Sequence, residues 1–252
     1  MVHVGALPGA PGNDTSVDLL AAQAANEALI LAEAGFDAIM IENMHDRPYV
    51  HGDHGPHIAA AMTRIGLEVA NVTNAPLGVQ ILSGGNREAL AISQAIGGSF
   101  IRCENFVFSH VADEGLLATA EAGHLLRYRK LIGVEHIKIC CDLKKKHASH
   151  ALTSDISIGD AAEAAEFFGA DAVVVTGTAT GKPTDVADIQ EVRNACSLPV
   201  LVGSGVTPAN IGKMFEFADA LIVGSSIKKD GKWFNGPDAA RCREIVKAAR
   251  GG

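Results

Sequence analysis

The sequence repeats one pattern eight times: a short apolar run ending in polar or glycine residues, followed by a stretch with helical periodicity. The expected strands are Val2–Leu7, Ala38–Glu42, Leu77–Leu82, Phe100–Asn105, Ile137–Leu143, Ala172–Gly177, Val200–Gly205 and Leu221–Ser225. The expected helices are Asp18–Ala34, His57–Val72, Arg87–Ile96, Leu116–Ile132, Ile158–Phe168, Val186–Ala195, Pro208–Phe217 and Pro237–Ala249. Eight such units in 252 residues predict an α/β fold, a single-domain (β/α)8 TIM barrel over residues 1–252. An open doubly wound sheet is disfavoured, because no G-x-G-x-x-G motif follows the first strand.

Composition and charge restrict the class of protein. The formal net charge is -8, which argues against nucleic-acid binding, since that requires clustered cations. No apolar stretch reaches the roughly 20 residues of a membrane span, and the 5 cysteines form no C-x-x-C pair, which predicts reduced thiols. Met1 runs directly into the first expected strand without any lead-in, so we expect the start of that region to be missing. The expected location is the cytoplasm, or the mitochondrial matrix if a targeting segment is missing as well.

Side chains alternate in character along four consecutive expected strands. One side of each strand carries Val, Ile or Cys, and the other carries mainly polar residues. Because one side of a barrel strand faces the helices and the other fills the interior, the polar side is predicted to be the interior side. The side chains that would meet at the C-terminal mouth are Glu42, Gln80, Glu104 and Asp142. Arg102 and Lys138 lie deeper on the same side, and for them an interior ion-pair layer is the alternative interpretation.

Two loops rich in small residues follow the seventh and eighth expected strands. Gly203 and Gly205 allow the backbone to approach a ligand, and Thr207 is expected to cap a helix that starts at Pro208. Barrels commonly bind phosphate at these two loops through backbone N–H groups. The predicted phosphate-binding residues are Gly203, Ser204, Gly205, Gly224, Ser225 and Ser226. The alternative is that the glycines only permit tight turns.

The loop after the second expected strand, residues 43–57, holds four histidines: His45, His51, His54 and His57. A long polar loop of this kind is typical of an active-site lid or of a contact with a neighbouring subunit, which would make the protein a homo-oligomer. Histidine and aspartate are common metal ligands, but the irregular spacing makes these four histidines weak candidates. No cofactor is identified, and a divalent metal is kept as an alternative. Asp53 or His54 could also act as an acid or base.

The loop after the fifth expected strand holds three consecutive lysines, beginning at Lys144, and then His147. Lys144 is predicted to point inward, where a cation beside an anion site would complement a phosphorylated ligand. A solvated run of charge is the alternative, and a lysine that forms a Schiff base would need desolvation and a depressed pKa. After the sixth strand, Thr176 and Thr178 supply hydroxyls suited to a sugar or phosphate, in an order that is not a Walker loop.

Six segments spread over nearly the whole chain resemble the BtpA/SgcQ family. They read VHVGALPGAPG at 2–12, ENMHDRPY at 42–49, DLKKKH at 142–147, ALTSD at 151–155, VTGTATG at 175–181 and GSGVT at 203–207. The resemblance implies a barrel related to phosphate-binding barrels. It also implies one bacterial member linked to photosystem I biogenesis at thylakoid membranes and another encoded in a sugar-utilisation cluster.

Two functions are left open by the sequence. The first is an enzyme that acts on a small phosphorylated metabolite, such as a sugar or nucleoside phosphate, or a protein that binds an inorganic anion, with the reaction type unassigned. The expected catalytic residues are Glu42, Glu104, Asp142 and Lys144. The expected ligand-orienting residues are His3, Asn43, Gln80, Thr176 and Thr178. The second function, a non-catalytic assembly factor for a membrane protein complex, rests on the resemblance alone.

Overall fold

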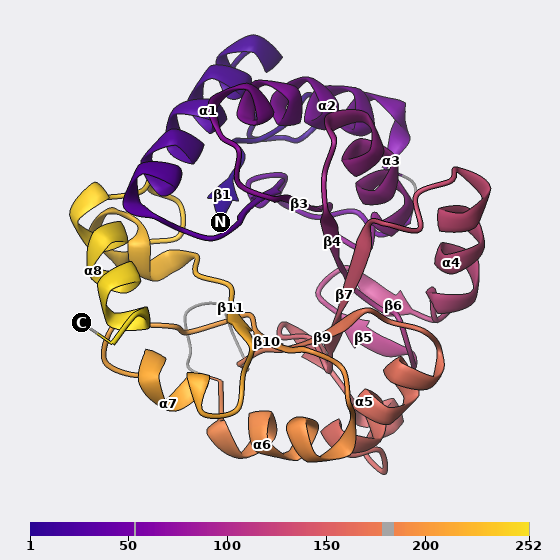
Figure 1. The fold of residues 1–252 in the computed structure, drawn as a ribbon. Helices are drawn as coiled ribbons and strands as arrows, with labels where there is room; N and C mark the ends of the chain where they lie inside the picture. The colour runs from indigo at the N-terminus through magenta and orange to yellow at the C-terminus, as the bar shows by residue number, and fades with distance from the viewer. Residues whose placement is uncertain (53, 178–183, 252) are drawn as a thin grey trace.

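The main sheet of the computed structural model, which describes residues 1–52, 54–177 and 184–251, contains eight parallel strands in chain order. They are β1 (Val2–His3), β2 (Ile39–Glu42), β3 (Leu77–Gln80), β4 (Phe100–Cys103), β7 (Lys138–Leu143), β9 (Ala172–Val175), β10 (Val200–Val202) and β11 (Ala220–Leu221). The strands curl into a ring surrounded by helices (Figure 1). Among the described residues no ladder joins β11 to β1, but the Met1 amino group donates to the Val223 carbonyl at 2.8 Å. The predicted TIM-barrel fold is confirmed, with incomplete closure of the sheet.

Eight helices follow the strands of the main sheet in the described part of the chain. They are α1 (Val17–Ala34), α2 (Gly55–Val72), α3 (Asn86–Ile96), α4 (Ala122–Leu131), α5 (Ile158–Phe167), α6 (Val186–Ala195), α7 (Ile211–Phe215) and α8 (Ala239–Ala249). Two of these helices start clearly later in the chain than the sequence predicts. Helix α4 starts after Leu116, and α7 starts after Pro208 with Asn210 at its N-cap. Thr207 is therefore not the cap; its backbone N–H donates to the Asn210 side chain at 2.8 Å.

A second, smaller sheet takes the place of the expected start of α4. It has the antiparallel order β6-β5-β8, formed by β5 (His110–Ala112), β6 (Gly115–Leu117) and β8 (Ala148–Ser149). Because β5 and β6 follow β4 and β8 follows β7, this sheet connects two loops at the carboxyl ends of the main strands. The turn between β5 and β6 carries Asp113 and Glu114, which both line the cavity described below.

The amino-terminal half of the barrel interior is closed by apolar side chains. Cys140, Ala172 and Val174 form a buried cluster against the partly buried Phe100. A Cβ atom on Gly78 would lie only 2.2 Å from the Phe100 ring, so glycine at this position makes room for the ring. The prediction of an interior Lys138 is wrong: its side chain is 61% exposed, and its ammonium pairs with Asp171 at 3.2 Å. Lys138 is the first residue of β7, so its long side chain can reach solvent.

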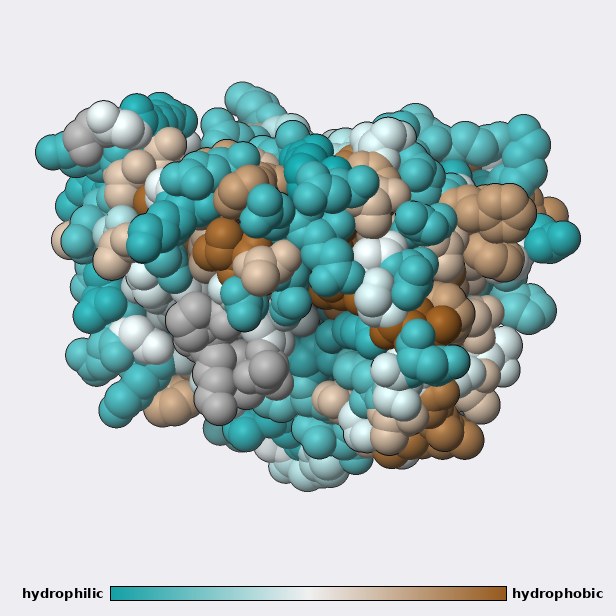
Figure 2. All heavy atoms as spheres, turned by 90° about the horizontal axis from the view of Figure 1, so that it is seen from below, coloured by the Kyte–Doolittle hydropathy of each residue, from teal (hydrophilic) through white to brown (hydrophobic). Residues whose placement is uncertain are grey.

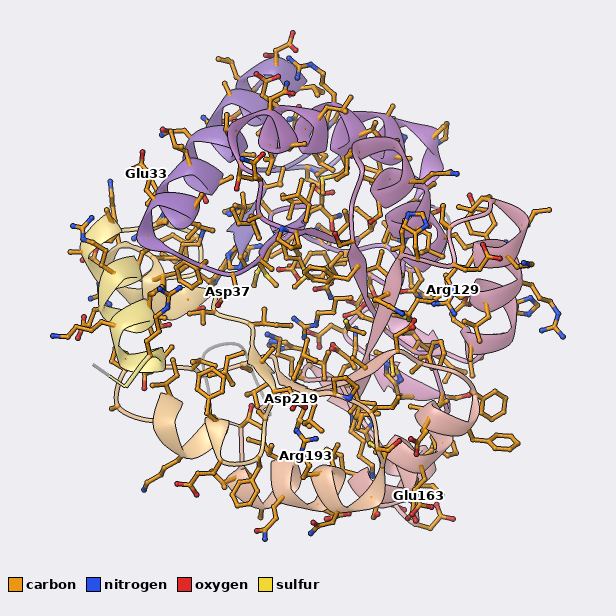
Figure 3. The ribbon with its side chains drawn as sticks, in the orientation of Figure 1. Glu33, Asp37, Arg129, Glu163, Arg193 and Asp219 are labelled. Atoms are coloured by element: carbon orange, nitrogen blue, oxygen red, sulfur yellow. The ribbon has the colours of Figure 1, made fainter. Side chains whose placement is uncertain are left out.

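Ion pairs at the amino-terminal ends of the strands join them to helices (Figure 3). Arg193 of α6 pairs with Asp219, which precedes β11, and Arg129 of α4 pairs with Asp171, which precedes β9. The outer face seen in Figure 2 is mainly hydrophilic, with small hydrophobic patches between charged side chains. None of the helices in the described ranges has the length and apolar character needed to cross a bilayer. The amino-terminal end of the barrel therefore carries structural contacts, and polar groups available for chemistry gather at the opposite end.

Candidate functional site

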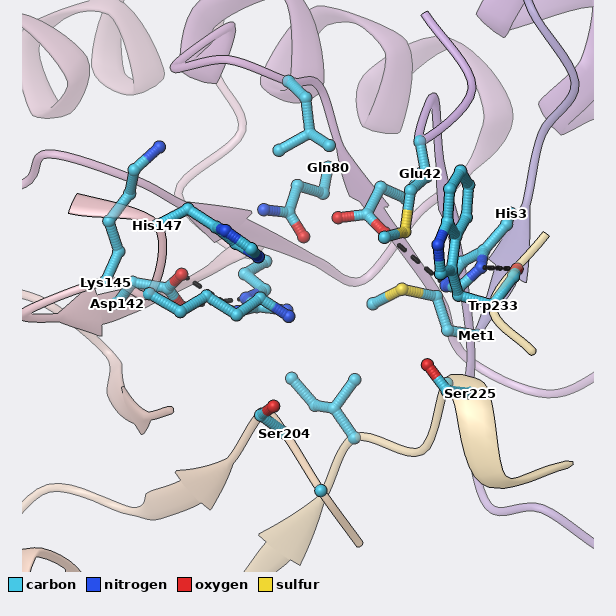
Figure 4. Close-up of a pocket in the computed structure, with 18 of the residues that line it drawn as sticks. Met1, His3, Glu42, Gln80, Asp142, Lys145, His147, Ser204, Ser225 and Trp233 are labelled. Carbon is cyan, nitrogen blue, oxygen red and sulfur yellow. Dashed lines mark hydrogen bonds and ion pairs between the residues drawn. The ribbon is translucent and has the colours of Figure 1, made fainter. Parts of the chain in front are cut away.

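A cavity of about 550 Å³ lies at the carboxyl ends of the main strands. One wall is formed by polar residues at the ends of four neighbouring strands: Glu42, Gln80, Arg102, Glu104 and Asp142. The facing wall is formed by the loops after β10 and β11, with Gly203, Ser204, Gly205, Gly224, Ser225 and Ser226. Figure 4 shows Ser204 and Ser225 across the opening from Gln80. The polar residues predicted from strand alternation and the two loops rich in small residues thus line the same cavity.

Arg102 provides a fixed positive charge in the polar wall. Its Nε and Nη2 atoms donate to the two carboxylate oxygens of Asp142 at 2.8 and 2.9 Å, and both side chains are buried. Burial opposes the charged guanidinium, but Asp142, together with Glu42 and Glu104, raises the pKa of Arg102. Because both oxygens of Asp142 bind Arg102, the pair forms a rigid bidentate unit at the edge of the cavity.

Glu104 is held as a carboxylate by groups from two loops and from strand β4. It accepts hydrogen bonds from the Gly84 backbone N–H at 2.9 Å and from Lys145 Nζ at 3.3 Å. Burial acts to raise its pKa, but Lys145, the Gly84 N–H and Arg102 together lower the pKa of Glu104. Lys145 also lies 3.8 Å from Glu114, in the turn of the small sheet. This sheet therefore places a second carboxylate beside the same ammonium.

The pKa of Glu42 is shifted in the opposite direction from that of Glu104. Burial raises its pKa, even though Arg102 and Lys146 act to lower it. The Nε2 atom of His3 lies 3.8 Å away, and the Nδ1 atom of His3 is 2.8 Å from the Trp233 carbonyl oxygen. A carbonyl only accepts, so Nδ1 carries the hydrogen, and burial followed by Lys228 holds the pKa of His3 low. Neutral His3 thus presents an acceptor to Glu42, which favours the protonated carboxyl.

The raised pKa of Glu42 predicts a measurable pH dependence of stability. The folded protein binds this proton more tightly than the unfolded chain, so the contribution is fully present below the ordinary pKa of 4.5 and is lost as pH rises through the folded pKa. Glu42→Gln removes the ionisation. Relative to wild type, its free energy of unfolding should increase with pH above 4.5, by about 1.4 kcal/mol for each unit by which the pKa is raised. Urea unfolding at a series of pH values checks this, and a constant difference between the two proteins would contradict it.

The prediction that Lys144 points into the cavity is wrong. Its ammonium donates to the backbone carbonyls of Thr153 and Ile156, on the side of the loop that faces α5. Lys144 has a positive φ of 42°, so the chain turns at this residue directly after β7. The two following lysines, Lys145 and Lys146, line the cavity instead.

Two of the expected ligand-orienting residues position loops and do not line the cavity. Asn43 accepts from the Leu82 N–H at 2.7 Å and donates to Asp46 at 2.8 Å. Thr176 accepts from the backbone N–H of Lys146 at 3.1 Å. Thr178 lies outside the described residues. His3 and Gln80 do line the cavity, as expected.

The four histidines of the loop after β2 do not gather. His45 packs on the Trp233 ring at 5.0 Å, and His54 Nε2 is 3.0 Å from the Ser83 carbonyl oxygen. Among the described residues, which exclude Asp53, no three His, Cys, Asp or Glu side chains could hold a metal ion. The loop instead lines the cavity through Met44, Arg47 and Tyr49.

One aromatic residue at the mouth was missed by sequence reasoning. Trp233 lines the cavity after β11, and the Arg47 guanidinium lies 4.6 Å from the centroid of its ring. A cation over an indole face is an attractive arrangement that joins the two loops. Trp233 is the single tryptophan of the sequence, and its place in a loop after the last strand could have drawn attention to it.

Comparison with known sequences gives full-length matches. The profile of the BtpA family matches residues 1–251. An uncharacterized mitochondrial protein of Caenorhabditis elegans is 41% identical over 252 residues, covering 98% of this chain and 90% of the relative. The photosystem I biogenesis protein BtpA of Synechocystis is 31% identical over 249 residues, covering 98% and 86% of the two chains.

Solved structures of low sequence identity share the fold. Orotidine 5'-monophosphate decarboxylase of Methanocaldococcus jannaschii, complexed with the inhibitor BMP, has a TM-score of 0.62 at 14% identity, covering 91% of this chain and 93% of that one. (S)-3-O-geranylgeranylglyceryl phosphate synthase of Thermoplasma acidophilum, in complex with its substrate sn-glycerol-1-phosphate, has a TM-score of 0.59 at 18% identity, covering 90% and 87%. At these identities the likeness establishes the barrel fold.

Proposed function

The chain belongs to the BtpA family, and from this premise we propose that it is an enzyme that binds a small phosphorylated metabolite at the carboxyl ends of its strands. One observation carries the proposal: a single cavity joins the loops after β10 and β11 to a wall of buried ionisable side chains. Barrel enzymes commonly bind phosphate at the loops after their last two strands. They carry their catalytic side chains at the carboxyl ends of several strands.

The phosphate would bind against Gly203–Gly205 and Gly224–Ser226. These small residues leave backbone groups accessible, and their hydroxyls can donate to phosphate oxygens. In the described part of the chain, Ser226 Oγ and Gln80 Oε1 are buried without a hydrogen-bond partner. Buried polar atoms are normally paired, so two unpaired ones in the same cavity support a polar ligand there.

The two glutamates would divide the acid and base work. Glu42 has a raised pKa and suits proton donation, whereas Glu104 has a lowered pKa and stays ionised beside Lys145. Neighbouring titratable groups with pKa values pushed apart are the usual sign of an acid and base pair. The names of the solved structures with this fold, a decarboxylase of a monophosphate and a synthase bound to glycerol phosphate, support a phosphorylated ligand by analogy only.

A thermal-shift screen tests the proposal. The compounds are sn-glycerol 1-phosphate, dihydroxyacetone phosphate, ribose 5-phosphate, nucleoside monophosphates and inorganic phosphate, each with and without added Mg²⁺. The proposal expects at least one of them to raise Tm, because binding to the folded state alone stabilises it. The same compound should change the emission of Trp233 at the mouth. No shift with any compound, and no change in emission, would count against phosphate binding.

A non-catalytic role in assembling a membrane protein complex is a second candidate, supported by the name of the Synechocystis relative. A homo-oligomer and a location in the cytoplasm or the mitochondrial matrix also stay proposals, and the name of the C. elegans relative supports a mitochondrial location. Affinity purification from membrane and soluble fractions separates the two functions. Stable recovery of a membrane complex that is unchanged when the anion site is blocked would favour assembly.

A further inference from the structure

The three consecutive lysines after β7 have different environments. Lys144 is tied to backbone carbonyls outside the cavity, and Lys145 lies between Glu104 and Glu114. Lys146 lines the cavity, and its ammonium makes no hydrogen bond or ion pair with the part of the chain that the structure describes. Its backbone N–H is fixed by the Thr176 hydroxyl at 3.1 Å. The loop is thus anchored while one primary amine is left available inside the site.

The surroundings of Lys146 shift its ionisation toward the neutral amine. Burial and then the Arg102 guanidinium lower the pKa of Lys146, and the acidic side chains of Glu42, Asp142 and Glu104 oppose this only in part. The Arg102 charge is permanent because a guanidinium is not deprotonated in proteins, and Asp142 fixes its position through two hydrogen bonds. A neutral lysine amine in a desolvated pocket is a nucleophile for carbonyl carbon.

We infer that Lys146 forms an imine with a phosphorylated aldehyde or ketone bound in this cavity, an inference that rests on the proposed function. The Nζ lone pair attacks the carbonyl carbon; Nζ gives up one proton and the carbonyl oxygen takes one, which gives a carbinolamine. Nζ then gives up its second proton, the oxygen takes a second proton and leaves as water, and one C=N bond replaces the C=O bond. Glu42 lines the same cavity, and its raised pKa suits its carboxyl group to relay a proton in these steps.

Borohydride trapping tests the inference. The purified protein is incubated with dihydroxyacetone phosphate or with glyceraldehyde 3-phosphate, reduced with sodium borohydride, digested and analysed by mass spectrometry. Hydride addition to the imine carbon leaves a stable secondary amine. The expected result is one peptide that is heavier by the mass of the probe less one oxygen atom, with the modification on Lys146.

Matched variants give the controls. Lys146→Arg keeps a long basic side chain but cannot form the imine, and should lose the adduct, whereas Lys144→Arg should keep it. An adduct spread over surface lysines, or one that survives in Lys146→Arg, overturns the inference. So does the absence of any adduct on the wild-type protein, whatever the folding of the variants. If the thermal-shift screen still finds phosphorylated ligands, the imine alone is wrong; if it finds none, the proposed function is wrong as well.

Discussion

Replacing Arg102 by methionine should lower the free energy of unfolding by about 3–5 kcal/mol, the usual effect of breaking a buried ion pair. The loss is expected because the substitution leaves a buried carboxylate without its partner. In the wild-type protein, both oxygens of Asp142 accept hydrogen bonds from Arg102. Without the guanidinium the carboxylate loses its hydrogen-bonded counter-charge in a site that water cannot fully solvate. Urea unfolding at neutral pH, followed by far-UV circular dichroism, measures the loss.

Two further variants show whether the loss comes from the stranded carboxylate. Arg102→Met combined with Asp142→Leu removes both charges and should recover most of the stability, because paired removal leaves nothing unsatisfied. Lys130→Met breaks the exposed pair with Glu135 and should leave the unfolding curve almost unchanged. A loss at Arg102→Met of less than about 1 kcal/mol would contradict the buried pair described here.

Replacing Ser225 by aspartate should weaken the binding of a phosphorylated ligand about a hundredfold, which corresponds to about 2.7 kcal/mol. Ser225 lines the cavity beside Gly224, where the phosphate is proposed to bind, and a carboxylate there would repel it. Ser225→Asn adds a side chain of nearly the same shape without the charge, so it is the matched control. Quenching of the single tryptophan, Trp233, gives the affinity of all three proteins.

The comparison between the two Ser225 variants separates charge from size. If both lose binding equally, then bulk explains the result and the anion site is not supported. If neither loses binding, the ligand lies elsewhere in the cavity. Only a large loss confined to the aspartate agrees with a phosphate at this loop.

Side-chain alternation made the polar wall predictable. A strand residue points to one of two sides, so Ile39 and Ile41 facing the helices require Met40 and Glu42 to face the interior. The same reasoning placed Gln80, Glu104 and Asp142 at the cavity without any structure. It did not show that Asp142 binds Arg102, because contacts between strands depend on their register.

Loop side chains could not be placed in this way. Successive loop residues have no fixed periodicity, so the sequence could not show which lysine points inward. The chain turns at Lys144, and Lys145 and Lys146 line the cavity in its place. The strands of the small sheet have only two or three residues each, too short for an alternating pattern, and one of them, β6, overlaps the start of the helix expected from Leu116. Trp233 lies in an irregular segment before α8, so no periodicity could show that its side chain lines the mouth of the cavity.

We propose above that this cavity recognises phosphate on a small molecule. Calorimetric titration of each compound that raises Tm, beside its dephosphorylated counterpart, tests it most directly. We expect the phosphorylated compound to bind with one site per chain and at least about tenfold more tightly, a difference of about 1.4 kcal/mol. Equal affinities for the two forms would contradict the claim.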